Sequence, residues 1–288
     1  MMTHGPHLGD GDSFPRDQVH VYALVVPAGY GDLPIGRSAA ARVLSPGELE
    51  RFDRARLQRR RNDLVLSRVL LRAILKQLGL DREGDPGLTA DANGKPHLTP
   101  RAGRSPLHLN TSDTAGMIIW TFSHQGPLGC DVERIGEDRD GIAESHFAPR
   151  EFADYRRLSG ERKLRRFYEI WTLKEAVLKA DGRGLGVPLD SFCFRMVDSD
   201  PEGPPGFDIL APQAGPAPGP WRFHRYCPST THQAAVAVQT PVEVTFQCHL
   251  LHLEEFDPEF NNPWRFSLAS DRDPLARPFE HVIFDPAG

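Results

Sequence analysis

Two acidic residues, Asp131 and Glu133, lie two positions apart in the segment LGCDVE, residues 128–133. The alternation of residue types in this segment predicts a β-strand, on which residues two apart project from the same face, roughly 6.5 to 7 Å from each other. Two carboxylates held so close repel each other unless a cation lies between them. Oxygen-only ligands favour Mg²⁺, which completes its shell with water and substrate phosphates. The alternative is an edge strand whose outer face is simply polar.

A second charged pair, Lys174 and Glu175, lies on what should be the buried face of a helix. The apolar residues of this helix recur at helical spacing, at Leu164, Phe167, Tyr168, Trp171 and Leu178. Burying a carboxylate and an ammonium costs several kcal/mol unless both find partners. Gly182, Gly184 and Gly186 then end the helix. If helix and strand meet, Glu175 becomes a third metal ligand; otherwise the pair is a surface feature on a helix whose stripe drifts by one residue.

The composition is that of a soluble globular protein, with 39% hydrophobic and 25% charged residues among 288. No apolar run approaches the length of a membrane span, and the N-terminal residues lack the basic and apolar regions of a signal peptide, so we expect a cytoplasmic protein without a membrane partner. The scattered Cys130, Cys193, Cys227 and Cys248 have no zinc spacing, and we expect small buried side chains in a reducing compartment.

The net charge of −5 is unevenly distributed, because residues 51–61 (RFDRARLQRRR) carry six arginines and one aspartate. A solvated helix face is the common reason for such a run. An electropositive site for phosphates, for an acidic protein or for nucleic acid is the sharper interpretation. Composition alone does not choose between them.

The positioning elements follow from periodicity and from turn residues. Ser45, Pro46 and Glu48 open a helix that runs through the arginines, and residues 63–78 continue as a buried helix that Gly79 stops. The predicted strands are residues 19–26, 107–109, 117–123, 128–133, 191–197, 221–227, 233–239 and 242–248. One further helix is predicted to start at Pro149, and another to span residues 162–180. Residues 199–220 are predicted to be a loop or an insertion.

A weak internal repeat relates two parts of the chain. Pro46 and Pro149 are 103 residues apart, and at this offset Ala73, Leu75, Lys76 and Gly79 recur identically as Ala176, Leu178, Lys179 and Gly182. Helices share composition, so chance similarity is one explanation. The other is a duplication, which predicts an α+β fold of two halves with a ligand cleft at their interface. We expect a disordered segment at residues 1–18, halves at 19–126 and 127–250, and a loosely packed extension at 251–288.

The combination of GCDVE with WTLKEAVLKADGRGLG, residues 171–186, resembles the paired signature of the surfactin-type (group II) 4′-phosphopantetheinyl transferases. The family pattern is G-[IV]-D-[IV]-E followed by W-[ST]-x-K-E-[AS]-x-x-K-x-x-G-x-G-L. All fixed positions of the second motif are filled, by Trp171, Thr172, Lys174, Glu175, Ala176, Lys179, Gly182, Gly184 and Leu185. The resemblance covers roughly residues 19–240 and includes Asn93-Gly94-Lys95-Pro96 and NTSDTAG, residues 110–116. It implies the fold of that family, two pseudosymmetric α+β halves with the active site at their interface, and a monomer.

The resemblance also implies a reaction. Coenzyme A binds in the cleft with Mg²⁺ on its pyrophosphate, a serine of an acyl or peptidyl carrier protein attacks the β-phosphate, and 3′,5′-ADP leaves. By matching positions, Asp131, Glu133 and Glu175 hold the metal, and Glu175 takes the serine proton. The implied coenzyme A ligands are Arg51, Lys95, Ser112, Asp113, Lys174 and Lys179, with Arg60, Arg61 and Arg72 as further candidates. Carrier proteins are acidic, so the arginines could also steer them.

Two positions depart from the family pattern. The family's N-x-S-H is Asn110-Thr111-Ser112-Asp113 here, and Glu48 stands where relatives often have lysine. Both changes remove positive charge from the nucleotide end of the site. The alternative function is therefore a catalytically impaired homologue that binds coenzyme A or a carrier. Nucleic-acid binding conflicts with the acidic net charge, and hydride transfer conflicts with glycines that follow a helix instead of a strand.

Overall fold

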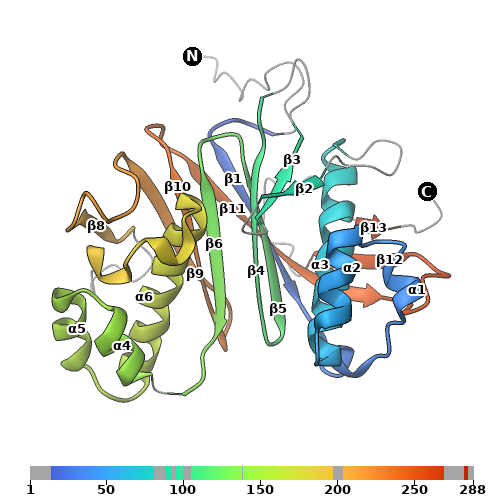
Figure 1. The fold of residues 1–288 in the computed structure, drawn as a ribbon, viewed down its shortest axis with the longest axis horizontal. Coiled ribbons are helices and arrows are strands. Elements are labelled where there is room, and N and C mark those ends of the chain that lie inside the picture. Colours follow the sequence, from blue (N-terminus) through green and yellow to red (C-terminus); the bar gives the residue numbers. More distant parts are fainter. Residues whose placement is uncertain are drawn as a thin grey trace, which may run out of the picture.

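The computed structural model describes residues 14–80, 88–91, 95–99, 105–137, 139–196, 204–268 and 282–284. Within these residues the chain forms a mixed α+β fold, as predicted, with helices on the two outer sides and strands between them (Figure 1). The expected disordered segment up to residue 13 and the turn at Asn93-Gly94 lie outside the described residues. No described helix is both long enough and apolar enough to cross a lipid bilayer.

The first sheet has six strands in the order β13-β12-β11-β1-β5-β4. Its strands are β1 (Gln18–Val25), β4 (His108–Thr114), β5 (Met117–Ser123), β11 (Thr245–Glu255), β12 (Trp264–Leu268) and β13 (Val282–Phe284). β1 pairs antiparallel with β5 and parallel with β11, so the start and the late part of the chain meet in the middle of this sheet.

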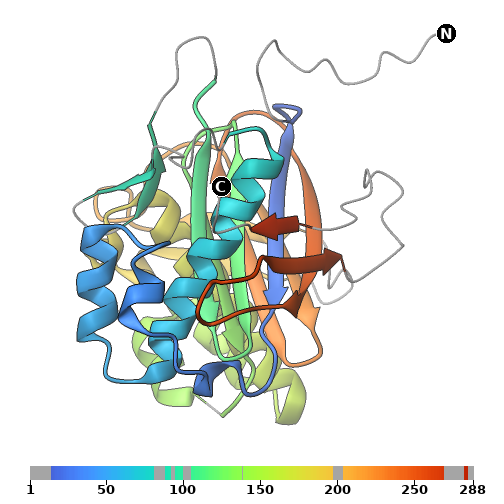
Figure 2. The same ribbon diagram turned by 90° about the vertical axis from the view of Figure 1, so that its right-hand side faces the viewer.

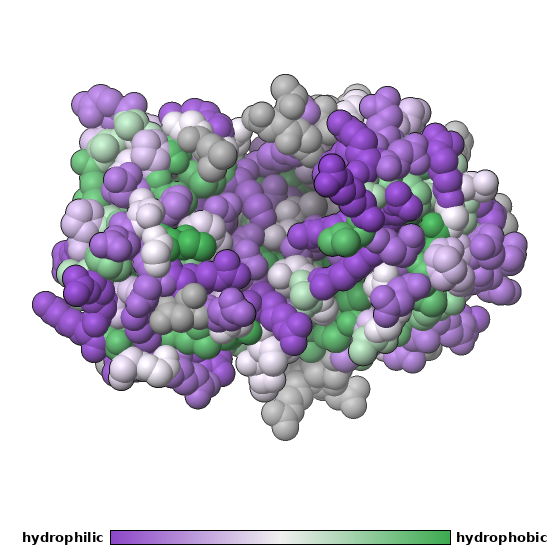
Figure 3. All heavy atoms as spheres, turned by 60° about the horizontal axis from the view of Figure 1, so that its bottom comes forward, coloured by the Kyte–Doolittle hydropathy of each residue, from purple (hydrophilic) through white to green (hydrophobic). Residues whose placement is uncertain are grey.

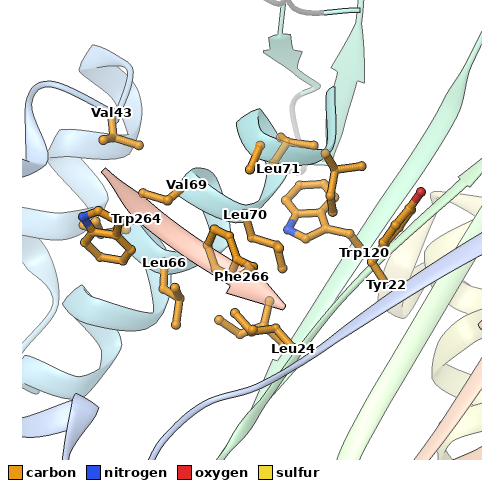
Figure 4. Packing of buried hydrophobic residues seen from close by; sticks show 14 of the residues in the cluster. Tyr22, Leu24, Val43, Leu66, Val69, Leu70, Leu71, Trp120, Trp264 and Phe266 are labelled. Atoms are coloured by element: carbon orange, nitrogen blue, oxygen red, sulfur yellow. The ribbon is translucent and has the colours of Figure 1, made fainter. Parts of the chain in front are cut away.

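Helices α2 (Pro46–Arg54) and α3 (Gln58–Gln77) lie on the outer side of the first sheet. Apolar residues of α3 recur at helical spacing and pack against side chains of β1, β5 and β12; Figure 4 shows Leu66 and Leu70 of α3 facing Leu24 and Phe266. These side chains are almost fully removed from water, which at about 25 cal/mol per Å² of apolar surface makes them the main support of this half. The short α1 (Arg37–Ala40) precedes α2.

The second sheet has three strands in the order β6-β10-β9, namely β6 (Leu128–Arg134), β10 (His232–Gln239) and β9 (Trp221–Ser229). Helix α6 (Gly160–Asp181) packs on it through a cluster that includes Leu173, Ala235 and Phe223. The helix ends at Gly182, which adopts a left-handed φ of 84° as expected of a glycine C-cap. Helices α4 (Asp140–His146) and α5 (Pro149–Arg156) and the β7–β8 pair (Phe192–Arg195 and Gly206–Ile209) flank α6.

The two sheets face each other across a shared apolar core. Alternate residues of β1 and β5, such as Val21 and Ile119, contact alternate residues of β6 and β10, such as Cys130 and Val236. The result is a sequence of layers in which α3, the first sheet, the second sheet and α6 follow one another (Figure 1). Each sheet is therefore covered on both faces, which explains why β5 and β10 read as nearly continuous apolar runs.

Several predicted elements differ from the structure. The helix opened by Ser45 ends at Arg54, because Ala55 takes an extended conformation, and α3 begins as a new helix at Gln58. The polar residues 110–114 were expected to separate two strands, yet they belong to β4, where Asn110 and Ser112 are buried and Asp113 is exposed. Helix α4 was missed, and the loop predicted at residues 199–220 contains β8.

The expectation of a loosely packed extension after residue 250 is wrong for its described part. Leu251 of β11, Phe260, Trp264 and Phe266 are buried in the core under α3. β12 and β13 lie beside α3, as Figure 2 shows. The bulky side chains after residue 250 are spaced too irregularly in the sequence to predict a helix or a strand, although they belong to the core between α3 and the first sheet. The prediction for cysteines is half correct, since Cys130 and Cys193 are buried but Cys227 and Cys248 are exposed.

Candidate active site

Strand β4 faces strand β6 through alternate side chains. Asn110 accepts a hydrogen bond from the backbone N–H of Cys130 at 3.0 Å, and two residues on, Ser112 donates from Oγ to Asp131 Oδ1 at 2.8 Å. Because side chains two apart share a face of a strand, this row of polar groups lies along the line where the two sheets meet. A polar seam between two apolar cores is unusual, and it places the predicted Ser112 and Asp131 together.

Helix α6 approaches β6 most closely at Gly129. A Cβ atom on this residue would lie 2.1 Å from the carbonyl oxygen of Ala176 and 2.4 Å from the backbone nitrogen of Ala180, so a side chain cannot be accommodated. The helix backbone therefore rests directly on the strand, two residues before Asp131. The sequence motif includes this glycine, but its role as the contact point was not predicted; a glycine within a strand is the signal for such a close approach.

The ammonium of Lys179 completes the seam. Its Nζ donates to Asp131 Oδ1 at 2.7 Å and to Ser112 Oγ at 2.8 Å. Burial alone would lower the pKa of Lys179, but the Asp131 carboxylate outweighs it and holds the pKa above its ordinary value, so the lysine is charged. The other oxygen of Asp131, Oδ2, is buried and has no hydrogen-bond partner. A buried carboxylate oxygen without a partner calls for a cation or a donor.

The other two predicted metal ligands share the field of Asp131. Burial, reinforced by the charge of Asp131, raises the pKa of Glu133 to about 7, and Thr114 donates to its Oε2 at 3.4 Å. Burial and the same aspartate also raise the pKa of Glu175. Within the described part of the chain no three acidic, histidine or cysteine side chains stand close enough to enclose an ion by themselves. The all-oxygen donor set with the free Asp131 Oδ2 nevertheless fits Mg²⁺, which keeps water and substrate oxygens in its shell.

A hollow lies between the two lobes of the molecule (Figure 3). In the space-filling view, hydrophilic residues surround this hollow, with the lobe of α4 to α6 on one side and that of α2 and α3 on the other (Figure 3). Glu175 and Glu133 are only partly buried, so solvent reaches both. That the two halves meet at a cleft with acidic residues stays a prediction.

Lys174 does not belong to the cleft, which corrects its assignment as a coenzyme A ligand. Its side chain is 0% exposed and its Nζ lies 2.8 Å from Glu151 Oε2, which is equally buried. The remaining N–H groups of Lys174 donate to the carbonyl oxygens of Leu189 and Phe192. Glu151 in turn accepts the backbone N–H groups of Ala148 and Phe194. The ammonium is thus fully used in a network that joins α5, α6 and β7, and no phosphate can reach it.

Lys95 also has a structural role in this arrangement. Its Nζ donates to the carbonyl oxygens of Leu128, Lys179 and Ala180, at 3.2, 2.6 and 3.5 Å, which ties the hairpin strand β3 (Pro96–Leu98) to the end of α6. Burial lowers the pKa of Lys95. It lines a cavity of about 440 Å³ together with His108 and other residues. The predicted contact with phosphate therefore requires Lys95 to leave these carbonyl groups.

Both acidic departures from the family pattern are neutralised by arginines of α3. Arg60 Nη1 lies 2.9 Å from Asp113 Oδ2, and the Arg60 side chain stays 62% exposed. Glu48 forms an ion pair with Arg68, accepts the N–H of Ser45, and has a lowered pKa in spite of its partial burial, because Arg68 and Ser45 stabilise its charge. Sequence analysis missed these pairs because they join residues 53 and 20 positions apart. Arg51 lies exposed on α2.

Comparisons with known proteins show what the chain resembles. The sequence model of the "4'-phosphopantetheinyl transferase superfamily" matches residues 127–237. The chain is 29% identical over 172 residues to 4'-phosphopantetheinyl transferase ffp of Bacillus subtilis, covering 58% of this chain and 74% of that protein. It is 29% identical over 225 residues to 4'-phosphopantetheinyl transferase HetI of Nostoc sp., covering 77% and 88%.

A solved structure of Thermotoga maritima holo-[acyl-carrier-protein] synthase (AcpS) aligns with a TM-score of 0.31 and 18% identity, over 40% of this chain and 62% of that one. The matched residues 127–237 contain the strand β6 and the helix α6 that form the seam. Over these residues the chain is similar to the 4′-phosphopantetheinyl transferase superfamily, and the relatives that it resembles also include 4'-phosphopantetheinyl transferase Sfp of Bacillus subtilis.

Breaking the buried Lys174–Glu151 pair should destabilise the fold. Glu151→Ala leaves an uncompensated buried ammonium and should lower the free energy of unfolding by about 3 to 5 kcal/mol in urea titrations. The double variant Glu151→Leu/Lys174→Met should recover most of this loss, because it removes both charges. Asp154→Ala, which breaks the exposed pair with Arg157, is the matched control and should change stability by about 1 kcal/mol or less. A single variant as stable as the control would contradict the network.

Removing the charge of Glu133 should stabilise the metal-free protein above neutral pH. Because its pKa is raised to about 7, the folded state binds more protons than the unfolded state between about pH 4.5 and 7, and stability falls as pH rises through this window. After allowance for solvent screening, Glu133→Gln should gain about 1 kcal/mol at pH 8 in chelator and nothing below about pH 5. Thermal melts check this, with Glu161→Gln, an exposed carboxylate on α6, as control. Equal melting temperatures at both pH values would refute the assignment.

Proposed function

We propose that the protein transfers the 4′-phosphopantetheine arm of coenzyme A to a serine of an acyl or peptidyl carrier protein, with Mg²⁺, and releases 3′,5′-ADP. The proposal is supported by the match of residues 127–237 to the superfamily model and by relatives whose names state this activity. The observation that carries it is the buried Asp131, with one oxygen held by Lys179 and Ser112 and the other without a partner. Such a carboxylate is prepared for a divalent cation.

Asp131, Glu133 and Glu175 are the proposed ligands of the metal. When bound, Mg²⁺ neutralises the pyrophosphate and stabilises the leaving group. In its absence Lys179 is the counter-ion of Asp131. When a pyrophosphate enters, the same ammonium lies beside the phosphate oxygens and contacts them as a point charge, while Ser112 orients the carboxylate. Burial, reinforced by the charge of Asp131, raises the pKa values of Glu133 and Glu175, and a cation bound beside them would stabilise their charged forms.

Glu175 is the proposed acceptor of the serine proton. The serine Oγ of the carrier attacks the β-phosphorus, the bond from this phosphorus to the bridging oxygen of the 3′,5′-ADP group breaks, and the hydroxyl proton passes to the carboxylate directly or through water. A base works best when its pKa lies near the working pH, and burial raises the pKa of Glu175 toward that range. Its partial exposure lets an incoming hydroxyl reach it.

Arg60 is the proposed ligand for the 3′-phosphate at the nucleotide end. It takes over the positive charge that the family pattern places at position 113, because Asp113 orients its guanidinium while leaving most of it exposed. Arg51 and Arg61 are secondary candidates, and Lys95 would have to be released from the end of α6. The alternative function, a catalytically impaired homologue, was based on Asp113 and Glu48. Both residues have arginine partners, which weakens that alternative.

The two-half organisation is part of the proposal. Helices α2 and α5 begin at the two prolines 103 residues apart, and α3 at the same offset corresponds to residues 161–180, close to the bounds of α6. We propose a boundary near residue 126, with a pseudosymmetric relation between residues 19–126 and 127–250. Residues after 250 complete the sheet of the first half. A cytoplasmic monomer that binds neither nucleic acid nor membrane is the proposed working form.

The activity is tested by incubating the protein with coenzyme A, Mg²⁺ and a panel of apo carrier domains of fatty-acid, polyketide and nonribosomal-peptide type. Intact mass spectrometry should show the addition of one phosphopantetheine group on at least one carrier, and chelator should abolish the addition. Binding of coenzyme A with no transfer to any carrier would favour the impaired homologue.

Loss of the acidic ligands should abolish turnover without unfolding the protein. Asp131→Asn and Glu175→Gln should each reduce kcat/KM by at least about a hundredfold, because the metal loses a charged ligand and, for Glu175, the proton loses its acceptor. Glu161→Gln, on the same helix but 75% exposed, should keep normal activity. Initial rates and thermal melts of the same samples separate chemistry from folding. Near-normal turnover in both variants would overturn the assignment.

The role of Arg60 can be isolated by comparing coenzyme A with dephospho-coenzyme A, which lacks the 3′-phosphate. Arg60→Ala should raise the KM for coenzyme A about tenfold and leave that for dephospho-coenzyme A unchanged, because one charge-assisted contact is lost. In the Arg60→Ala background, Asp113→His should restore part of the affinity by returning a donor to position 113. Arg157→Ala on the other lobe is the control. An equal loss for both substrates would mean that Arg60 has only a structural role.

A further inference from the structure

An exposed leucine stands in the middle of the arginine-rich segment. Leu57 immediately precedes α3, and its side chain is 66% exposed, the largest value among the exposed large hydrophobic residues that the structure describes. Neighbouring contacts hold the turn in place: Arg61 donates from Nε to the carbonyl oxygen of Ala55 at 2.9 Å, and its guanidinium lies over the ring of Phe52. The leucine is thus presented to solvent on a turn that these contacts hold.

The surrounding positive charge is only partly neutralised within the protein. Arg59 and Arg60 have carboxylate partners in Asp63 and Asp113. Arg51, Arg54 and Arg56 have none among the described residues, and Arg54 uses one N–H on a backbone carbonyl. We call Arg51, Arg54, Arg56 and Leu57 the basic ridge. A cationic surface around an exposed apolar side chain matches the core-and-rim composition of a protein-docking site.

The basic ridge borders the cleft. Leu57 lies one helical turn before Arg60, and Arg60 contacts Asp113, the neighbour of Ser112 in the seam. Figure 3 shows strongly hydrophilic side chains on the rim over α2 and α3, with a small hydrophobic patch among them. A folded domain that rests on this rim can therefore extend a serine toward Asp131 while still contacting the ridge.

Resting on the proposed function, we propose that the basic ridge is the docking surface for the carrier domain, which meets it with carboxylates around an apolar residue. Charge complementarity selects an acidic partner. A nucleic acid would use the arginines but has no use for an exposed leucine at their centre, and the net charge of −5 opposes its approach. The other strongly exposed leucine, Leu210 at 53%, lies on the opposite lobe near the ion pair of Asp208 with Arg195, a locally neutral surface.

The test uses the full chain and the apo carrier that the wild type modifies most efficiently. Leu57→Asp should raise the KM for the carrier about tenfold, and Arg56→Glu about three- to tenfold, as expected when an anchor or a rim charge of an interface is reversed. The KM for coenzyme A and kcat at saturating carrier should stay unchanged, and the rate of the Arg56→Glu variant should depend less on salt. Leu210→Asp is the matched control and should behave as the wild type. Circular dichroism confirms that each variant is folded.

The outcomes separate this proposal from the function on which it rests. If the wild type modifies no carrier, the proposed function fails. If the wild type is active and Leu57→Asp and Arg56→Glu keep the wild-type KM, only the docking surface is refuted. A raised KM in Leu210→Asp alone would move docking to the other lobe. Duplex DNA bound at about 150 mM salt and lost in Arg56→Glu, with an unchanged carrier KM, would overturn the proposal in favour of a nucleic-acid surface.

Discussion

The direct contact between the backbone of α6 and Gly129 is the constraint on which the site depends. A single methyl group at this position would collide with the carbonyl oxygen of Ala176, so any other residue would push the helix away from β6. At the observed distance Lys179 of α6 reaches Asp131 of β6 and Ser112 of β4, so the contact joins three different elements. The site is therefore set by how closely two backbones can pack, and its polar groups occupy the space that this packing leaves.

Two consecutive residues of α6 show how one helix can serve both structure and chemistry. Lys174 points into the second half and is enclosed with Glu151 in a complete network of donors and acceptors. Glu175 is turned by about 100° around the helix axis, is only partly buried, and lies in the field of Asp131 and Lys179. The closed network fixes the rotation and height of the helix, and the incomplete one is left for ligands. A satisfied charge beside an unsatisfied one thus gives the open carboxylate a rigid support.

The sequence predicted much of this site because its signals are local. Strand alternation in residues 128–133 and the helical stripe ending at Gly182 located β6 and α6, and both misplaced charges of that stripe were recognised. What the sequence could not supply was the identity of partners distant in the chain. The resemblance implied that Lys174 binds coenzyme A, because nothing in the neighbouring sequence reveals its ion pair with Glu151. Asp113 was interpreted as a loss of positive charge from the site, because its partner Arg60 is 53 residues away in the chain. The prediction for the tail after residue 250 failed for another reason. Trp264 and Phe266 pack into a core that other elements build, so the apolar residues of the tail show no regular spacing in the sequence.

The parallel pairing of β11 with β1 has a consequence for the order in which the molecule is made. Gln18 lies beside Thr245, so the second strand of the chain's central pair emerges from the ribosome more than two hundred residues after the first. Until then β1 has a neighbour on only one side, and the apolar surface beneath α3 lacks Leu251, Trp264 and Phe266. The amino-terminal half therefore cannot close its core during synthesis and must wait for the end of the chain. In the nascent protein, the half that is translated first is the one that matures last.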